Sequence, residues 1–265
     1  MSINVFQAIL IGLWTAFCFS GMLLGIYTNR CIVLSFGVGI ILGDLPTALA
    51  MGAIGELAYM GFGVGAGGTV PPNPIGPGIF GTLMAITSAG KVSPEAALAL
   101  STPIAVAIQF LQTFAYTVRA GAPETAMKHL KNHNLKKFKF TLNATIWLFA
   151  FIGFTLGCLG ALSMDTLLKL VDYIPPVLLT GLTVAGKMLP AIGFAMILSV
   201  MAKKELIPFV LLGYVCAAYL NIPTIGIAIV GTIFALIEFY NKPKTAPNHS
   251  YLSQLDVTYK TPDLM

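Results

Sequence analysis

Long apolar runs dominate this chain of 265 residues, and they restrict it to a membrane fold. Only 9% of its residues are charged, whereas soluble domains have about 25%. Most runs approach the ~20 residues that an α-helix needs to cross the hydrocarbon core, and they lack the two-residue alternation of a transmembrane barrel. The sequence therefore predicts an all-α integral membrane protein, a polytopic helical bundle with runs at 3–27, 31–53, 96–118, 142–161, 177–201 and 207–240.

Cysteine usage and net charge argue against several other classes of protein. The four cysteines lie in apolar sequence without a CxxC pair or a histidine at metal-binding spacing, so we expect packing residues and no metal or cofactor. The net charge of +5 comes from a few short basic loops, which membrane topology explains better than nucleic acid does. The first run is longer than the apolar part of a secretory signal and has no Lys or Arg before it, so we expect it to remain as a span.

A basic segment divides the chain into two hydrophobic halves. Residues 119–140 carry six Lys or Arg against one Glu, which indicates a cytoplasmic loop by the positive-inside rule. We therefore expect a first transmembrane half at 1–118, the basic cytoplasmic loop at 119–140, a second transmembrane half at 141–240 and a polar C-terminal tail at 241–265.

Each half contains a segment in which a helix must break. Residues 55–90 are rich in glycine and proline, and we expect a re-entrant region there. The run 207–240 is interrupted by Asn221-Ile222-Pro223, which favours a re-entrant hairpin or two short tilted helices. Discontinuous helices in both halves are typical of transporters built from inverted repeats. The alternative is that these are ordinary packing turns.

Glu56 is the first candidate for binding a ligand. It lies in the apolar stretch GAIGELAYMG, where an ionised carboxylate needs a partner or water. It could accept hydrogen bonds from a polyhydroxylated ligand or receive a proton. The structural alternative is an ion pair with Lys187 or a cap on a helix N-terminus.

Polar groups around the glycine–proline stretch are further candidates. Asn73 can both donate and accept hydrogen bonds, Thr69 lies at the edge of the stretch, and neighbouring prolines such as Pro72 would hold the Asn73 amide in place. Asn73 could equally be a turn residue. Gln109 is an amide inside a span, and either a ligand contact or a bond between helices would explain it.

Known catalytic motifs are absent from the sequence. There is no Walker motif, GxSxG, HExxH or dinucleotide fingerprint. His129 and His133 lie in the basic segment without a neighbouring carboxylate to orient them, and a solvated face is the favoured interpretation. Asp44 is expected to cap or break a helix. We therefore expect no covalent chemistry from this chain alone.

The stretch GDLPTALAMGAIGELAYMG, its continuation GGTVPPNPIGPGIFGTLMAI and the following SPEAALALSTPIAVAIQ resemble a known family. They are similar to the IIC membrane component of the mannose/fructose/sorbose family of bacterial phosphotransferase-system sugar permeases. The stretch VAGKMLPAIGFAMILSVMAKKELIPFVLLGY resembles the second half of the same family, so the resemblance covers residues 3–240.

This resemblance implies a division of labour between subunits. A IIC chain forms the sugar pathway with a IID membrane subunit, and soluble IIA and IIB phosphocarriers pass phosphate from phosphoenolpyruvate to the incoming sugar. It also implies a multi-pass protein of the bacterial cytoplasmic membrane, surrounded by lipid, in a trimer of IIC–IID pairs. The chain itself would be a transport subunit and not an enzyme.

The resemblance also bears on the sugar. Glu56 matches the acid of the family's GELAYMG segment, and Asn73 occupies a place where mannose-type members carry Asp. The PPNP turn is more similar to the N-acetylgalactosamine/galactosamine branch. We therefore expect an amino sugar, with mannose, fructose or sorbose as alternatives. Lys187 departs from the small residue expected after VAG.

Two functions of other classes stay open at this point. An ion-coupled secondary transporter would use Glu56 as a proton carrier. A membrane scaffold, or a receptor for a bacteriocin-like partner, would not transport at all.

Overall fold

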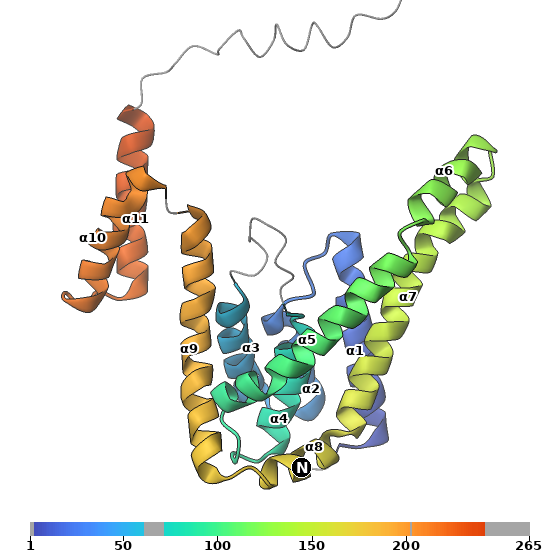
Figure 1. The fold of residues 1–265 in the computed structure, drawn as a ribbon, viewed down its shortest axis with the longest axis horizontal. Helices are drawn as coiled ribbons and strands as arrows, with labels where there is room; N and C mark the ends of the chain where they lie inside the picture. The colour runs from blue at the N-terminus through green and yellow to red at the C-terminus, as the bar shows by residue number, and fades with distance from the viewer. Residues whose placement is uncertain (1–2, 61–71, 202, 242–265) are drawn as a thin grey trace, which may run out of the picture. The chain divides into compact units, whose positions relative to one another are not determined.

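A computed structural model describes residues 3–60, 72–201 and 203–241, and these are helices joined by short connections (Figure 1). No strand occurs in these ranges, which confirms the all-α prediction. The helices in chain order are α1 (Val5–Gly21), the short η1 (Met22–Leu24), α2 (Cys31–Leu42), α3 (Leu45–Tyr59), the π-helix η2 (Gly76–Gly81), α4 (Thr82–Thr87), α5 (Pro94–Val118), α6 (Ala122–Lys131), α7 (Leu135–Leu162), α8 (Met164–Asp172), α9 (Pro176–Met201), η3 (Lys204–Leu206), α10 (Ile207–Ala218) and α11 (Thr224–Asn241).

Five helical segments in the described ranges are long and apolar enough to cross a membrane, which confirms the polytopic architecture. They are Val5–Leu24, Pro94–Lys131, Leu135–Leu162, Pro176–Ser199 and Thr224–Asn241. The helices α2 and α10 are apolar but shorter. The chain forms two compact units, Met1–Met201 and Ala202–Met265.

The second predicted span is broken, as the sequence indicated, and forms the hairpin α2–α3. Gly43 ends α2 with a φ of +80°, a left-handed conformation that glycine adopts without steric cost. Asp44 then caps α3 by accepting a hydrogen bond from the Thr47 backbone N–H at 3.2 Å, which confirms its predicted role. With 12 and 15 residues, the two helices reach only about 18 and 22 Å, so neither crosses the ~30 Å core alone.

The last run is also interrupted where the sequence predicted. Helix α10 ends at Ala218, Asn221 has a φ of +50°, and α11 begins at Thr224 after Pro223. These two helices pack against each other within the second unit. The predicted break at residues 221–223 is therefore confirmed, but α11 has 18 residues and is long enough to cross a membrane, so the pair is not made of two short helices; the re-entrant geometry and the inverted repeat remain predictions.

Helices far apart in the sequence support the hairpin. In the first unit α1 and α7 lie side by side (Figure 1), and the buried rings of Phe19 and Phe149 contact each other between them, tilted by 45° with centroids 5.1 Å apart. The buried η2 and α4 pack against both α2 and α5. The turn before η2 is therefore held between the start of α2 and the middle of α5.

Membrane sidedness remains a prediction that labelling can check. In a variant without native cysteines, single cysteines placed at Lys128 and at Lys242, which lies outside the described residues, should both react with an impermeant thiol reagent only from the cytoplasmic side. The reason is that basic residues flanking spans stay in the cytoplasm. Labelling of the two positions from opposite sides would contradict the hairpin interpretation of 207–240.

Candidate functional site

A cavity of about 330 Å³ lies in the first unit where the hairpin α2–α3 meets the turn before η2 and the middle of α5. Its volume is at the lower end of the ~300–1,000 Å³ range of small-molecule sites. Its lining includes three amides, the two members of an ion pair and a phenol. The lining residues are Met22, Asn29, Arg30, Cys31, Glu56, Tyr59, Pro72, Pro74, Gln109 and Gln112.

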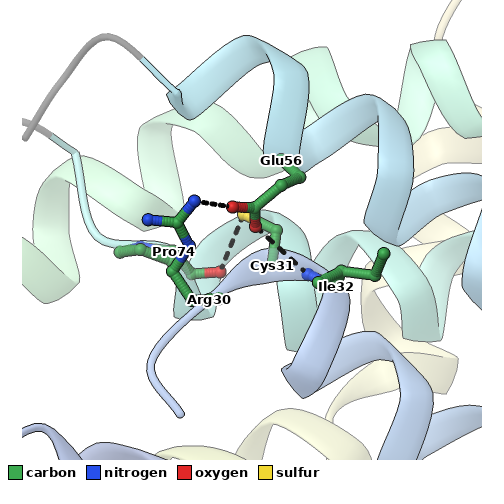
Figure 2. Close-up of polar contacts among 5 residues, drawn as sticks. All are labelled: Arg30, Cys31, Ile32, Glu56 and Pro74. Atoms are coloured by element: carbon green, nitrogen blue, oxygen red, sulfur yellow. Dashed lines mark hydrogen bonds and ion pairs between the residues drawn. The ribbon is translucent and has the colours of Figure 1, made fainter. Parts of the chain in front are cut away.

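The hairpin explains how Glu56 reaches this cavity. Because α2 and α3 run in opposite directions and pack side by side, the start of α2 lies beside the end of α3 (Figure 1). Glu56, one turn before the end of α3, therefore approaches the unpaired backbone N–H groups of α2. Its Oε2 accepts from the Ile32 N–H at 3.5 Å, and its Oε1 forms an ion pair with Arg30 (Figure 2).

The ion pair and the helix start stabilise the same carboxylate. The partial positive charge at the N-terminus of α2 favours a nearby anion, and the Arg30 guanidinium supplies a full positive charge. The Glu56 side chain is 19% exposed and that of Arg30 is 50% exposed, so the pair lies at the cavity wall and remains accessible. The suggested partner Lys187 lies exposed on α9, and the structure pairs Glu56 with Arg30 instead.

Another part of the cavity wall is formed by the amides of Asn29, Gln109 and Gln112 and by the Met22 thioether. The Asn29 Nδ2 donates to the Met22 sulfur at 3.5 Å, and the Gln112 Nε2 lies 3.9 Å from the same sulfur. A thioether is a weak acceptor, so both donors have only weak partners. The Asn29 Oδ1 is buried and accepts no hydrogen bond from the described residues. These groups could bind hydroxyl or carbonyl groups of an uncharged polar ligand.

Asn73 is not among the residues that line the cavity, but it contacts one of them. Its side chain is fully buried; Oδ1 accepts from the Ile75 N–H at 3.0 Å, and Nδ2 donates to Oε1 of Gln112. Its backbone N–H donates to the Ala105 carbonyl of α5 at 3.1 Å. Asn73 is thus a turn residue in its geometry, and its amide contacts a residue that does line the cavity.

The predicted site residues are therefore partly brought together. Glu56, Pro72 and Gln109 line the same cavity, Asn73 adjoins it through Gln112, and Thr69 lies outside the described residues.

Sequence reasoning missed other lining residues, among them Asn29, Arg30 and Gln112. Arg30 carried a signal, because it is the one charged residue between the first two apolar runs. Gln112 carried another, because it lies three residues after Gln109 and so shares its helix face.

Cys31 joins two parts of the site. Its thiol donates weakly to the Pro74 carbonyl at 3.8 Å, which connects the start of α2 to the turn before η2 (Figure 2). Cys31 is buried and free, as are Cys18 and Cys216, which agrees with their predicted packing role. Elsewhere, His133 is exposed and His129 half-buried at the end of α6.

Comparison with known proteins identifies the family of this chain. A family model described as "PTS system sorbose-specific iic component" matches residues 5–237. The sorbose-specific EIIC component of a PTS system from Lacticaseibacillus casei is 31% identical over 264 residues, which is 94% of this chain and 90% of that protein. N-acetylgalactosamine permease IIC component 1 of Escherichia coli K12 is 34% identical over 185 residues, covering 68% and 67%. The mannose-specific EIIC component of E. coli K12 is 29% identical over 92% of both chains.

Two solved structures share the fold. One, titled "Structure of membrane protein", has a TM-score of 0.82 and 28% identity, and the match covers 92% of this chain and 98% of that one. The other, a cryo-EM structure of the mannose transporter ManYZ in complex with microcin E492, has a TM-score of 0.57 and 29% identity over the same shares. The helical arrangement described above is therefore that of known membrane proteins.

Proposed function

The chain belongs to the sorbose-type IIC family of phosphotransferase-system (PTS) sugar permeases, and we propose that its cavity binds the sugar that the complex takes up. Members of this family are transport subunits in the bacterial cytoplasmic membrane, and the several spans of this chain agree with that location. The chain is thus a multi-pass permease subunit, and the proposal concerns its substrate, site and partners.

The observation that carries the proposal is the chemistry of the cavity wall. The amides of Asn29, Gln109 and Gln112 offer hydrogen-bond donors and acceptors, and the NH₂ groups of Asn29 and Gln112 have only the Met22 sulfur as an acceptor among the described residues. Sugar hydroxyls both donate and accept, so they can satisfy these groups. Glu56 can accept from a further hydroxyl while Arg30 keeps its charge balanced.

We favour N-acetylgalactosamine or galactosamine as the sugar, and mannose, fructose or sorbose are the alternatives. The PPNP turn supports an amino sugar, as does the 34% identity to an N-acetylgalactosamine permease component. Within this proposal Glu56, Pro72 and Gln109 contact the sugar directly. Thr69 remains a predicted contact.

The proposal includes partner proteins. A IID membrane subunit would complete the sugar pathway, and soluble IIA and IIB phosphocarriers would phosphorylate the sugar during uptake, in a trimer of IIC–IID pairs. The similarity to a ManYZ structure supports a membrane complex. The chain would not be catalytic alone, because the phosphate would be carried by IIA and IIB.

Uptake in cells tests this function directly. A strain lacking this gene should lose phosphoenolpyruvate-dependent uptake of labelled N-acetylgalactosamine and regain it when the gene is restored. Uptake that an uncoupler abolishes while phosphoenolpyruvate stays plentiful would favour a secondary transporter. Unchanged uptake together with resistance to a bacteriocin would favour a receptor. The family match favours neither of these alternatives.

A further inference from the structure

We propose that Asn73 selects the sugar without touching it, by fixing which end of the Gln112 side-chain amide faces the cavity. This inference rests on the proposed function, since it assumes that the cavity binds a sugar. It assigns a positioning role to Asn73 and the direct contact to Gln112. Neither side chain is free to adopt another arrangement easily, because Asn73 is fully buried and Gln112 is 8% exposed.

A backbone group decides the orientation of both amides. The Ile75 N–H can only donate, so the Asn73 atom 3.0 Å from it must be the oxygen, Oδ1. The other end of Asn73 is then the NH₂ donor, and it contacts Gln112. Gln112 must accept this bond with Oε1, which leaves its Nε2 donor to face the cavity.

The Gln112 NH₂ group, at the end of this chain of hydrogen bonds that faces the cavity, has only a weak acceptor. The Gln112 Nε2 lies 3.9 Å from the Met22 sulfur, and both residues line the cavity. A ligand oxygen is a far better acceptor than a thioether, so a bound sugar would replace this contact. The cavity therefore presents a donor, and not an acceptor, at Gln112.

A fixed donor distinguishes between sugar substituents. The carbonyl oxygen of an N-acyl group can only accept, so it requires a donor from the protein. A hydroxyl group both donates and accepts, so it tolerates either end of an amide. A buried group left without its partner lowers affinity far more than a weak contact does. The donor at Gln112 thus accommodates an N-acylated sugar, which an acceptor at the same place would disfavour.

Asn73→Asp should reverse the end of Gln112 that faces the cavity. When the new carboxyl group is ionised, one of its oxygens can still accept from the Ile75 N–H, and the other can only accept as well. Gln112 must then turn its Nε2 toward residue 73 and present Oε1 to the cavity. A carbonyl of an N-acyl sugar would meet another acceptor there, whereas a hydroxyl would donate to it.

The test is a competition between sugars in cells that contain the complete transport complex. We expect Asn73→Asp to lower uptake of N-acetylgalactosamine relative to mannose by tenfold or more. The ratio is measured within one variant, so it does not depend on the amount of protein in the membrane. Pro72→Ala is the matched control. It loosens the same turn while leaving the Asn73–Gln112 bond in place, and should reduce uptake of both sugars by the same factor.

A double substitution separates positioning from direct contact. In a Gln112→Met background no amide remains to be turned, so adding Asn73→Asp should leave the sugar ratio unchanged. If Gln112→Met abolishes uptake, the shift in melting temperature that each sugar causes in the purified complex gives the same ratio. An equal shift of the ratio with and without Gln112, or no shift in the single variant, would overturn the positioning role. If cells without the gene still took up both sugars normally, the proposed function itself would be overturned.

Discussion

Replacing Glu56 with Gln should reduce sugar uptake by tenfold or more while the protein remains inserted. The variant keeps the size of the side chain but removes the negative charge of the carboxylate, which accepts from the Ile32 N–H and pairs with Arg30. A charged hydrogen bond to the sugar contributes ~1.5–3 kcal/mol, and ~1.4 kcal/mol corresponds to a factor of ten. Because half of the Arg30 side chain is exposed, solvent screening keeps the contribution of the ion pair to folding small.

The matched control is another Glu in an ion pair. Glu124 pairs with Lys128 at 2.9 Å on α6, where both side chains are largely exposed, so Glu124→Gln should leave uptake within twofold of the wild type. If Glu56 and Arg30 act as one unit, Glu56→Gln combined with Arg30→Gln should be no worse than the more harmful single change. Normal uptake by a correctly inserted Glu56→Gln protein would remove Glu56 from the site.

Replacing Gly76 with Ala should impair both stability and uptake. Gly76 opens η2 directly against α5, and an alanine Cβ there would lie 2.7 Å from the Cα and 2.9 Å from the backbone nitrogen of Ala105. Since backbone atoms cannot move aside as side chains do, the turn must shift away from α5, at a cost of ~1–3 kcal/mol. We expect a lower melting temperature of the purified protein and at least a tenfold loss of uptake.

Gly181→Ala is the control for this substitution. Gly181 lies within α9, and no heavy atom lies within 4 Å of the position that a Cβ would occupy. An alanine there should leave uptake unchanged and stabilise the helix slightly, by ~0.4–1 kcal/mol. Equal melting temperatures for Gly76→Ala and the wild type would show that the turn does not depend on its close approach to α5.

Much of the helical layout could be predicted because its signals are local. Apolar length gives the spans, Gly43 and Asp44 together end one helix and cap the next, and Pro223 interrupts the last run. Each of these effects depends on a few neighbouring residues. The long packing of α7 along α1 depends on residues more than a hundred positions apart, and no local pattern predicts it.

The site could be predicted only in part, for a similar reason. Glu56 stands out because a carboxylate in apolar sequence needs an explanation. Its partner Arg30 lies 26 positions earlier, and only the antiparallel hairpin brings the two together. The bond between Asn73 and Gln112 joins residues 39 positions apart, so the sequence shows the two amides but not their contact.

The order of residues in the turn also affects how readily Asn73 can lose its side-chain amide by deamidation. Asparagine commonly converts to aspartate when the backbone nitrogen of the next residue attacks the side-chain amide and forms a cyclic imide. Pro74 follows Asn73, and a proline nitrogen carries no hydrogen and is already part of a ring. This route to aspartate is therefore closed at Asn73, the residue whose conversion would, under the proposed positioning role, reverse the hydrogen-bonding of Gln112.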